Sequence, residues 1–200
     1  MLTSTQKAEA QEVSLSDAIH LLDGSKLWLE GDTNVNKYQC EADTLSGFGR
    51  LEDAEKPQDT IQGHGKVYID VEIPVFKLDC GKKAMNRDMY NALKAEQHPR
   101  IQYSLKDAEL INIIRDENNV EWMNIRTTGF ITVAGVDREI EVYVLGKVLD
   151  NNQFHVVGEK ELDMTEFNIT PPRALFGLIK AREYITIKFD VIVALDDMNF

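Results

Sequence analysis

The sequence predicts an all-β antiparallel domain with one amphipathic helix, and three observations support this fold class. Short segments in which apolar and polar residues alternate recur along most of the chain. Turn-forming sequences separate these segments, and a single segment has the helical period instead. Many short strands in series with one helix indicate a closed barrel or a sandwich.

The clearest alternation lies in residues 67–73, where Val67, Ile69, Val71 and Ile73 are separated by polar or amphipathic side chains. A strand of this kind buries one face and exposes the other. Residues 185–193 repeat the pattern, and residues 35–40 are extended. Further alternating segments are expected at residues 25–31, 101–105, 110–114, 122–133, 140–145 and 154–164.

One helix is expected in residues 82–97, because Met85, Met89, Ala92 and Leu93 fall at helical spacing. Gly81 precedes this segment, and the His98-Pro99 pair that follows it favours extended backbone. The helix therefore interrupts the series of strands once.

The chain is expected to form an N-terminal arm at residues 1–24 and one barrel domain at residues 25–200, since no linker rich in Pro, Gly or Ser divides it. Within the arm, residues 13–22 fit either a short helical turn or an initial strand. Residues 169–181, with Pro171-Pro172 before an apolar run, fit either a packed connection or an apolar flap over a barrel mouth.

The charge balance argues against a nucleic-acid partner. Acidic residues outnumber basic ones 34 to 22, which gives a net charge of −12, whereas phosphate binding needs a basic face. No run approaches the roughly 18 to 20 apolar residues that a spanning helix requires, so no stable membrane insertion is expected. The first residues are polar and lack the apolar centre of a signal peptide. We therefore expect that this sequence does not include a signal peptide.

Four segments occur in a fixed order: SKLWLEG at 25–31, NRDMY at 86–90 leading to HPRIQY at 98–103, GFITVAGV at 129–136, and EFNI at 166–169. Together they resemble the YceI-like family of polyisoprenoid-binding, lipocalin-like proteins. The third is similar to that family's G-x-L-T-I-x-G-V hairpin and the fourth to its D-F-G-I element. His98 stands where the family usually has Tyr, and Tyr90 where it often has His or Leu.

The resemblance implies an eight-stranded antiparallel lipocalin-like barrel, with the helix near one end and an elongated isoprenoid-like lipid inside. Eight strands enclose an interior that side chains fill or that one small ligand occupies. An aliphatic chain gains roughly 0.8 kcal/mol for each buried CH₂, so binding needs no catalytic group and no cofactor.

The predicted ligand-binding residues are the inward apolar positions of these strands, although such positions in a small barrel can also be ordinary packed core. They are Val67, Ile69, Ile101, Tyr103, Ile131, Val133, Val142, Ile187 and Phe189. Arg87 on the helix, with Lys82 and Lys83 beside it, is predicted to pair with a polar or phosphate head group.

Cys40 and Cys80 are the only cysteines. Envelope members of the family look similar at both positions, so the resemblance implies a disulfide and a periplasmic or extracellular protein. The bridge would close a loop of about 40 residues and stabilise the fold by about 3 to 4 kcal/mol on the entropic model. The alternative is two reduced, buried thiols in a cytoplasmic protein.

No catalytic or metal-binding motif stands out. His20, His64, His98 and His155 lack the spacing of metal ligands, and neighbouring carboxylates are expected by chance in so acidic a chain. The chain is therefore predicted not to be an enzyme. A ligand-free structural or interaction module of the cell envelope is the alternative, followed by a hydrolase with its site at the barrel mouth. Exposed apolar edge positions could support a homodimer.

Overall fold

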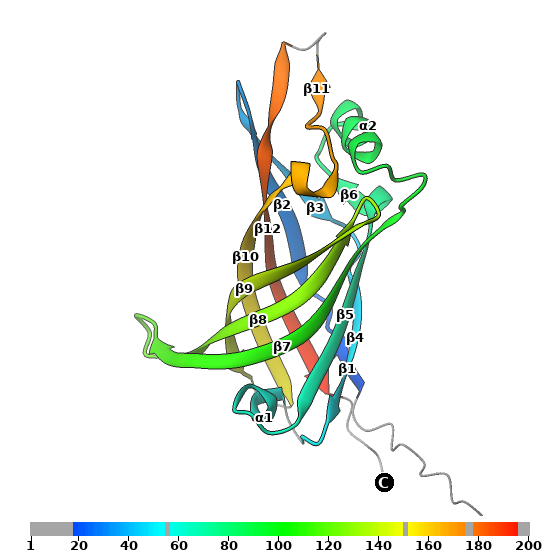
Figure 1. Cartoon of the computed structure of the whole chain (residues 1–200). Coiled ribbons are helices and arrows are strands. Elements are labelled where there is room, and N and C mark those ends of the chain that lie inside the picture. Colours follow the sequence, from blue (N-terminus) through cyan, green and yellow to red (C-terminus); the bar gives the residue numbers. More distant parts are fainter. Residues whose placement is uncertain (1–17, 55–56, 150–151, 175–177, 196–200) are drawn as a thin grey trace, which may run out of the picture.

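The alternating segments form strands that close on themselves in the computed structural model, which describes residues 18–54, 57–149, 152–174 and 178–195 (Figure 1). The strands are β1 (Ala18–Leu21), β2 (Lys26–Thr33), β3 (Lys37–Ala42), β4 (Ser46–Glu52), β5 (Lys66–Pro74), β6 (Leu78–Asp79), β7 (Arg100–Arg115), β8 (Glu121–Val133), β9 (Val136–Val148), β10 (Gln153–Asp163), β11 (Arg173–Ala174) and β12 (Ile179–Leu195). The helices are α1 (Pro57–Ile61) and α2 (Lys83–Ala92), with the 3-10 turns η1 (Val75–Lys77) and η2 (Met164–Phe167).

Eight strands form a closed ring in the order β1-β4-β5-β7-β8-β9-β10-β12, and β12 pairs back to β1. Each of these neighbouring pairs is antiparallel. The structure thus confirms the eight-stranded antiparallel barrel. β2 pairs with β12 on the same edge as β1. β2, β3 and β6 extend the wall from there toward the end of the barrel that carries α2, and α1 lies at the opposite end (Figure 1).

The first strand of the ring lies inside the range predicted to be an N-terminal arm. Ile19 of β1 pairs with Gly49 of β4 and with Leu195 of β12, so this short strand completes the barrel. Of the two alternatives for residues 13–22, the described part forms the initial strand, and the barrel begins before Ser25. Residues 1–17 of the predicted arm lie outside the described residues.

The segment predicted as a packed connection or flap is only partly described, because residues 175–177 fall outside the described residues. On either side of them, β11 pairs with the start of β12: Arg173 lies opposite Lys180 and Ala174 opposite Ile179. The described flanks of this segment therefore form a short antiparallel hairpin beyond the ring.

Among the elements that were not predicted, the strand β4 and the helix α1 each have a physical reason. In β4 the inward positions include Gly47 and Gly49, while the large apolar Phe48 is 66% exposed, so the hydropathy alternation is erased. A Cβ at Gly49 would lie 2.5 Å from the Tyr68 carbonyl oxygen, which explains the glycine. The helix α1 has five residues and is too short to show a period.

The strand β7 was predicted as two separate strands, at residues 101–105 and 110–114, and the structure shows one strand of 16 residues. Its pairing with β8 shifts register twice, between Leu105 and Asp107 and between Leu110 and Asn112. Each bulge adds a residue on one strand and changes which side chains face inward. The alternation therefore breaks although the strand continues.

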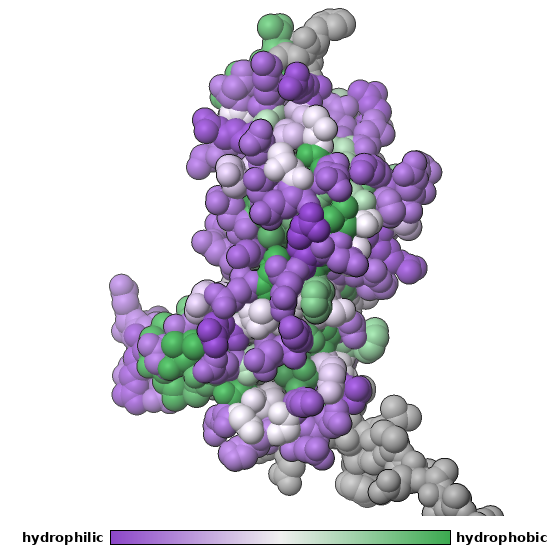
Figure 2. Space-filling model, in the orientation of Figure 1, coloured by the Kyte–Doolittle hydropathy of each residue, from purple (hydrophilic) through white to green (hydrophobic). Residues whose placement is uncertain are grey.

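Beyond the barrel wall, β7 and β8 continue as a projecting hairpin (Figure 1). β7 pairs with β5 only over residues 100–104, so the same edge of residues 105–115 pairs with no described strand. Ile111, Ile113 and Ile114 on this stretch are 46%, 56% and 40% exposed. Figure 2 shows apolar side chains gathered on the projection.

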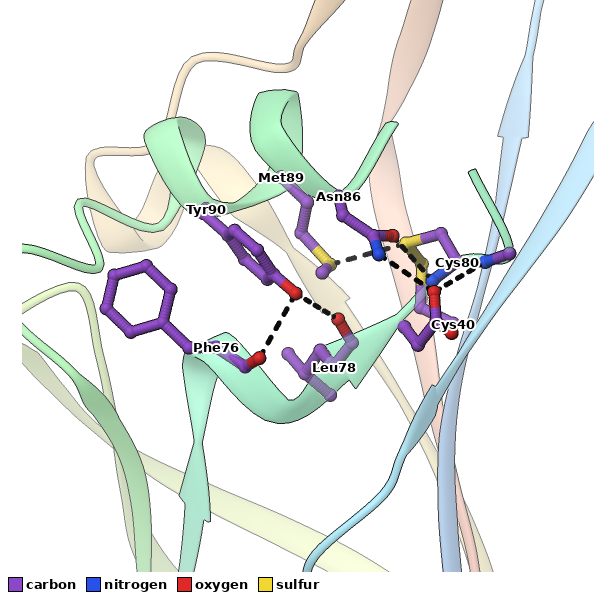
Figure 3. The surroundings of a disulfide bond; sticks show 9 residues. Cys40, Phe76, Leu78, Cys80, Asn86, Met89 and Tyr90 are labelled. Carbon is purple, nitrogen blue, oxygen red and sulfur yellow. Dashed lines mark hydrogen bonds between the residues drawn. A yellow bond between two sulfur atoms is a disulfide. The ribbon is translucent and has the colours of Figure 1, made fainter. Parts of the chain in front are cut away.

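A helix is confirmed within the expected residues 82–97, but α2 ends at Ala92 and residues 93–97 are turns. A disulfide joins the flank of α2 to the barrel (Figure 3). Cys40 of β3 and Cys80, which follows β6, form the predicted bridge, with 2.00 Å between the sulfurs. Cys40 is 1% exposed, and the Cys80 Sγ lies 3.6 Å from the Met89 Sδ of α2. The alternative of two reduced thiols is therefore not what the structure contains.

Hydrogen bonds also hold α2 over β6 and over Cys80, the residue that follows it. The Tyr90 hydroxyl donates to the Leu78 carbonyl at 2.8 Å, and the Asn86 side-chain oxygen accepts from the Cys80 amide at 2.7 Å (Figure 3). The Asn86 amide group also donates to Asp79, and this bond, together with the Gly81 amide, lowers the pKa of the Asp79 carboxyl. α2 is thus fixed to the barrel both covalently and by its polar contacts.

Removal of the disulfide should lower stability substantially. A Cys40→Ala/Cys80→Ala variant should lose about 3 to 4 kcal/mol in its free energy of unfolding, measured by urea titration, because the open loop gains entropy when unfolded. The unmodified protein in reducing agent is the control and should lose a similar amount. A loss below about 1 kcal/mol in both would contradict the structural role assigned to the bridge.

Candidate ligand-binding cavity

The inward faces of the barrel strands line a cavity of about 240 Å³. Its wall runs from Thr60 and Ile61 of α1 at one end of the barrel to Leu78 of β6, beneath α2, at the other. Between these ends the described lining is dominated by Ile, Val, Leu and Phe side chains from the strands. The space is therefore long and bounded almost entirely by hydrocarbon.

Eight of the nine predicted apolar positions lie in this lining: Val67, Ile69, Ile101, Tyr103, Ile131, Val142, Ile187 and Phe189. They come from five strands, β5, β7, β8, β9 and β12, and the barrel closure brings them together. Whether they contact a ligand stays a prediction.

The remaining two predicted residues lie elsewhere. Val133 is the last residue of β8, is 6% exposed and packs in the buried cluster near α2, outside the cavity lining. Arg87 lies on the solvent side of α2 with its side chain 72% exposed, and its nearest acid is Asp88 at 3.7 Å. α2 turns Met89 and Tyr90 toward the barrel, which leaves Arg87, Lys82 and Lys83 on the outside.

Three glycines keep aromatic rings flat against the wall. A Cβ at Gly129 would lie 2.6 Å from the Tyr103 hydroxyl oxygen, one at Gly146 would lie 2.6 Å from the Phe154 ring, and one at Gly158 would lie 2.6 Å from the Phe189 ring. All three rings line the cavity. Because each ring lies over a glycine instead of projecting toward the barrel axis, the centre of the barrel stays open.

A few polar groups interrupt the apolar wall. Burial raises the pKa of the Tyr103 hydroxyl, and a hydrogen bond with Thr127 opposes that shift. The Thr127 hydroxyl donates to the Val142 carbonyl at 2.9 Å. Among the described residues, no fully buried side-chain nitrogen or oxygen lacks a partner. His20, Thr60 and Lys160 are the other polar residues of the described lining.

The barrel wall separates at two places, one toward each end. Toward the α1 end, β5 and β7 pair only through residues 70–74 and 100–104, and α1 contacts both strands beyond that stretch. Ile61 of α1 is buried in a cluster with Ile125 and Phe154, so it closes this gap from inside.

Toward the α2 end, β9 and β10 pair only from Val148 and Phe154 to Val144 and Gly158. Beyond this point the two strands separate, and η2 contacts β9 and β12. Phe167 of η2 is 2% exposed and belongs to the buried cluster near α2. A second opening in the ladder is thus covered by a helical turn rather than by a strand.

Sequence reasoning missed several lining residues. Ile19, Thr60 and Ile61 lie on elements that were ambiguous or unpredicted. Lys160 was missed because it is polar, although it shares the parity of Phe154 and Val156 within an expected strand. Its position in that alternation is the signal that could have identified it.

The described lining contains no Asp, Glu, Ser or Cys side chain. No group of three or more His, Cys, Asp or Glu among the described residues could hold a metal ion. His155 lies outside the lining, with its Nε2 2.6 Å from Asp190 and its ring against Trp122, and the His98 ring packs over Gly135. Within the described part of the chain, these histidines have structural neighbours.

The helices give no sign of a membrane span: none in the described part of the chain combines the length and the apolar character that crossing would need.

Three solved structures share this fold over most of both chains. A polyisoprenoid-binding domain from Saccharophagus degradans, implicated in plant cell wall breakdown, gives a TM-score of 0.64 at 11% identity and covers 89% of this chain and 98% of its own. BcnA of Burkholderia cenocepacia gives 0.61 at 17% identity, with 84% and 95% covered. The YCEI protein of Campylobacter jejuni gives 0.55 at 15% identity, with 83% and 85% covered.

These likenesses establish a YceI-like fold for this chain, as the sequence resemblance implied. No protein-family profile matches the sequence, and no curated protein matches it.

The contact between Gly158 and Phe189 gives a test of how the wall is built. Gly158→Ala should lower the free energy of unfolding by about 1 to 3 kcal/mol, because the new methyl group forces the Phe189 ring off its position. In a Phe189→Leu background the same change should cost less than about 0.5 kcal/mol, since the clashing ring is gone. Equal losses in both backgrounds, measured by chemical denaturation, would rule out this packing.

Proposed function

We propose that this chain is a YceI-like carrier that binds an elongated apolar lipid, of the isoprenoid kind, inside its barrel without chemical change. The observation that carries the proposal is the cavity itself: a space of about 240 Å³ inside the barrel with a hydrocarbon wall. The S. degradans structure is described as a polyisoprenoid-binding domain, which supports the same ligand class here.

The physical basis is burial of apolar surface. Each CH₂ group that leaves water contributes roughly 0.8 kcal/mol, so a chain of several isoprene units binds firmly with no specific contact. A long, narrow space selects a flexible linear molecule over a broad ring system. Release of the ligand then requires only that one of the two covered gaps in the barrel wall opens, either between β5 and β7 or between β9 and β10.

The alternatives are less well supported. A ligand-free structural or interaction module would be expected to fill its interior, whereas glycines beneath Tyr103, Phe154 and Phe189 keep this one open. A hydrolase that uses a serine, cysteine or carboxylate nucleophile would need that group at the cavity, and the described lining has none of the three. We therefore favour sequestration and release, with no cofactor.

Location in the periplasm or outside the cell is part of the proposal. Disulfides form and persist in oxidising compartments, and the Cys40–Cys80 bridge fixes the covered end of the barrel. A homodimer stays a prediction. The unpaired edge of β7, with its exposed isoleucines, is the surface through which we expect the dimer to form.

Organic extracts of the purified protein, analysed by mass spectrometry, test the ligand class. A polyprenyl or comparable aliphatic chain should be recovered in a fixed ratio to protein, because a deeply buried apolar molecule dissociates slowly. An extract with no lipid, together with no uptake of added geranylgeraniol, would refute the carrier function.

A cavity-filling variant tests the location of the ligand. Val142→Trp places a larger ring in the lining and should weaken geranylgeraniol binding about tenfold, equivalent to about two CH₂ groups excluded from the cavity. Tyr143→Trp is the matched control, because Tyr143 is the next residue of β9 and is 55% exposed. Equal weakening by both variants in a titration would place the ligand elsewhere.

A further inference from the structure

Lys160 is the only Lys, Arg, Asp or Glu in the described lining of the cavity. It lies on β10 with the parity of Val156 and Leu162, and it is directly opposite Ile187, another lining residue. Its side chain is neither fully buried nor exposed. An ammonium group is therefore attached to a wall that is otherwise mostly hydrocarbon.

No acidic side chain in the described structure neutralises this ammonium. The adjacent residues on β10, Glu159 and Glu161, have the opposite parity and are exposed. Glu159 lies 3.4 Å from Lys188 on the outer face. Among the described residues, the Lys160 side chain has no hydrogen-bond or ion-pair partner.

The acidic residues of the neighbouring strand β9 are also directed elsewhere. Glu139 lies 2.8 Å from Lys106, and Glu141 lies 4.0 Å from Arg126, both on the outside of the barrel. A cation removed from bulk water without a counterion is unfavourable. Lys160 thus keeps its full capacity to bind an anion.

The position of Lys160 coincides with the opening between β9 and β10. The last paired residues are Val144 and Gly158, and continuing that register would place Lys160 opposite Val142. The strands separate at this step. A group bound at Lys160 lies at this gap, which η2 covers, while a chain attached to it lies among the apolar residues toward α1.

We propose that Lys160 binds the anionic head group, a carboxylate or a phosphate, of the elongated ligand. The ligand is then an anionic amphiphile whose tail runs from Lys160 past Val144 and Phe154 toward Ile61. This inference rests on the proposed carrier function and adds the chemistry of the head group and its place in the wall.

The interaction is a charge-assisted hydrogen bond, which is shorter and stronger than a neutral one. The low dielectric of the surrounding wall strengthens it further. In the alternative role, the aliphatic part of the lysine side chain packs on apolar surface and its ammonium contacts only water. Such a lysine would not distinguish an anionic ligand from a neutral one. Matched pairs of ligands therefore separate the two roles.

The test is calorimetric titration of delipidated protein with two pairs of matched chain: hexadecanoic acid against hexadecanol, and geranylgeranyl phosphate against geranylgeraniol. Lys160→Met should weaken binding of the acid, the phosphate or both by about tenfold or more and leave both alcohols within about twofold. The anion that loses more identifies the head group. Lys160→Arg should keep the preference for the anion.

Lys147→Met is the matched control, because Lys147 lies on the outer face of β9 over the Trp122 ring and its replacement changes the net charge equally. It should leave all four affinities within about twofold. Equal binding of anion and alcohol to the unmodified protein, unchanged in Lys160→Met, would overturn the inference and leave the carrier function standing. A parallel loss for all four ligands in Lys160→Met would overturn it too. Binding of none of the four would refute the carrier function itself.

Discussion

The whole structure depends on one constraint: the strand ladder must close into a ring. Closure is completed by four residues, Ala18–Leu21, which pair on one side with β4 and on the other with β12. Once the ring is closed, the inward side chains of its eight strands point into the same space. The cavity, its apolar lining and the isolated Lys160 all follow from that geometry.

The size of the interior is set by small residues as much as by large ones. Gly129, Gly146 and Gly158 let three aromatic rings lie along the wall. Helical segments cover the two places where the ladder separates, α1 between β5 and β7 and η2 near β9. At the end beneath α2, the disulfide and the Tyr90 and Asn86 hydrogen bonds fix the cover, so the two ends of the cavity differ in how firmly they are closed.

Sequence reasoning found most of this architecture because hydropathy alternation reports directly on inward and outward faces. Strands such as β5 and β12, whose inward positions are Val, Ile or Phe, were identified on that basis, and so were eight lining residues. It failed where the inward residue is glycine, as in β4, and where bulges change the parity, as in β7. Helix periodicity alone does not say which polar residue faces the barrel, and the head-group role predicted for Arg87, whose side chain is 72% exposed, stays a prediction.

The projecting edge of β7 exposes backbone N–H and C=O groups next to isoleucine side chains, which is the arrangement that joins sheets of separate molecules. Each copy carries a net charge of −12, and two of its acidic residues, Asp116 and Glu117, lie at the tip of the hairpin. Mutual repulsion of these charges opposes the approach of two such edges in dilute buffer. Salt screens that repulsion within about 8 to 10 Å at physiological ionic strength. The colloidal behaviour of this protein is thus governed by its medium as well as by its fold.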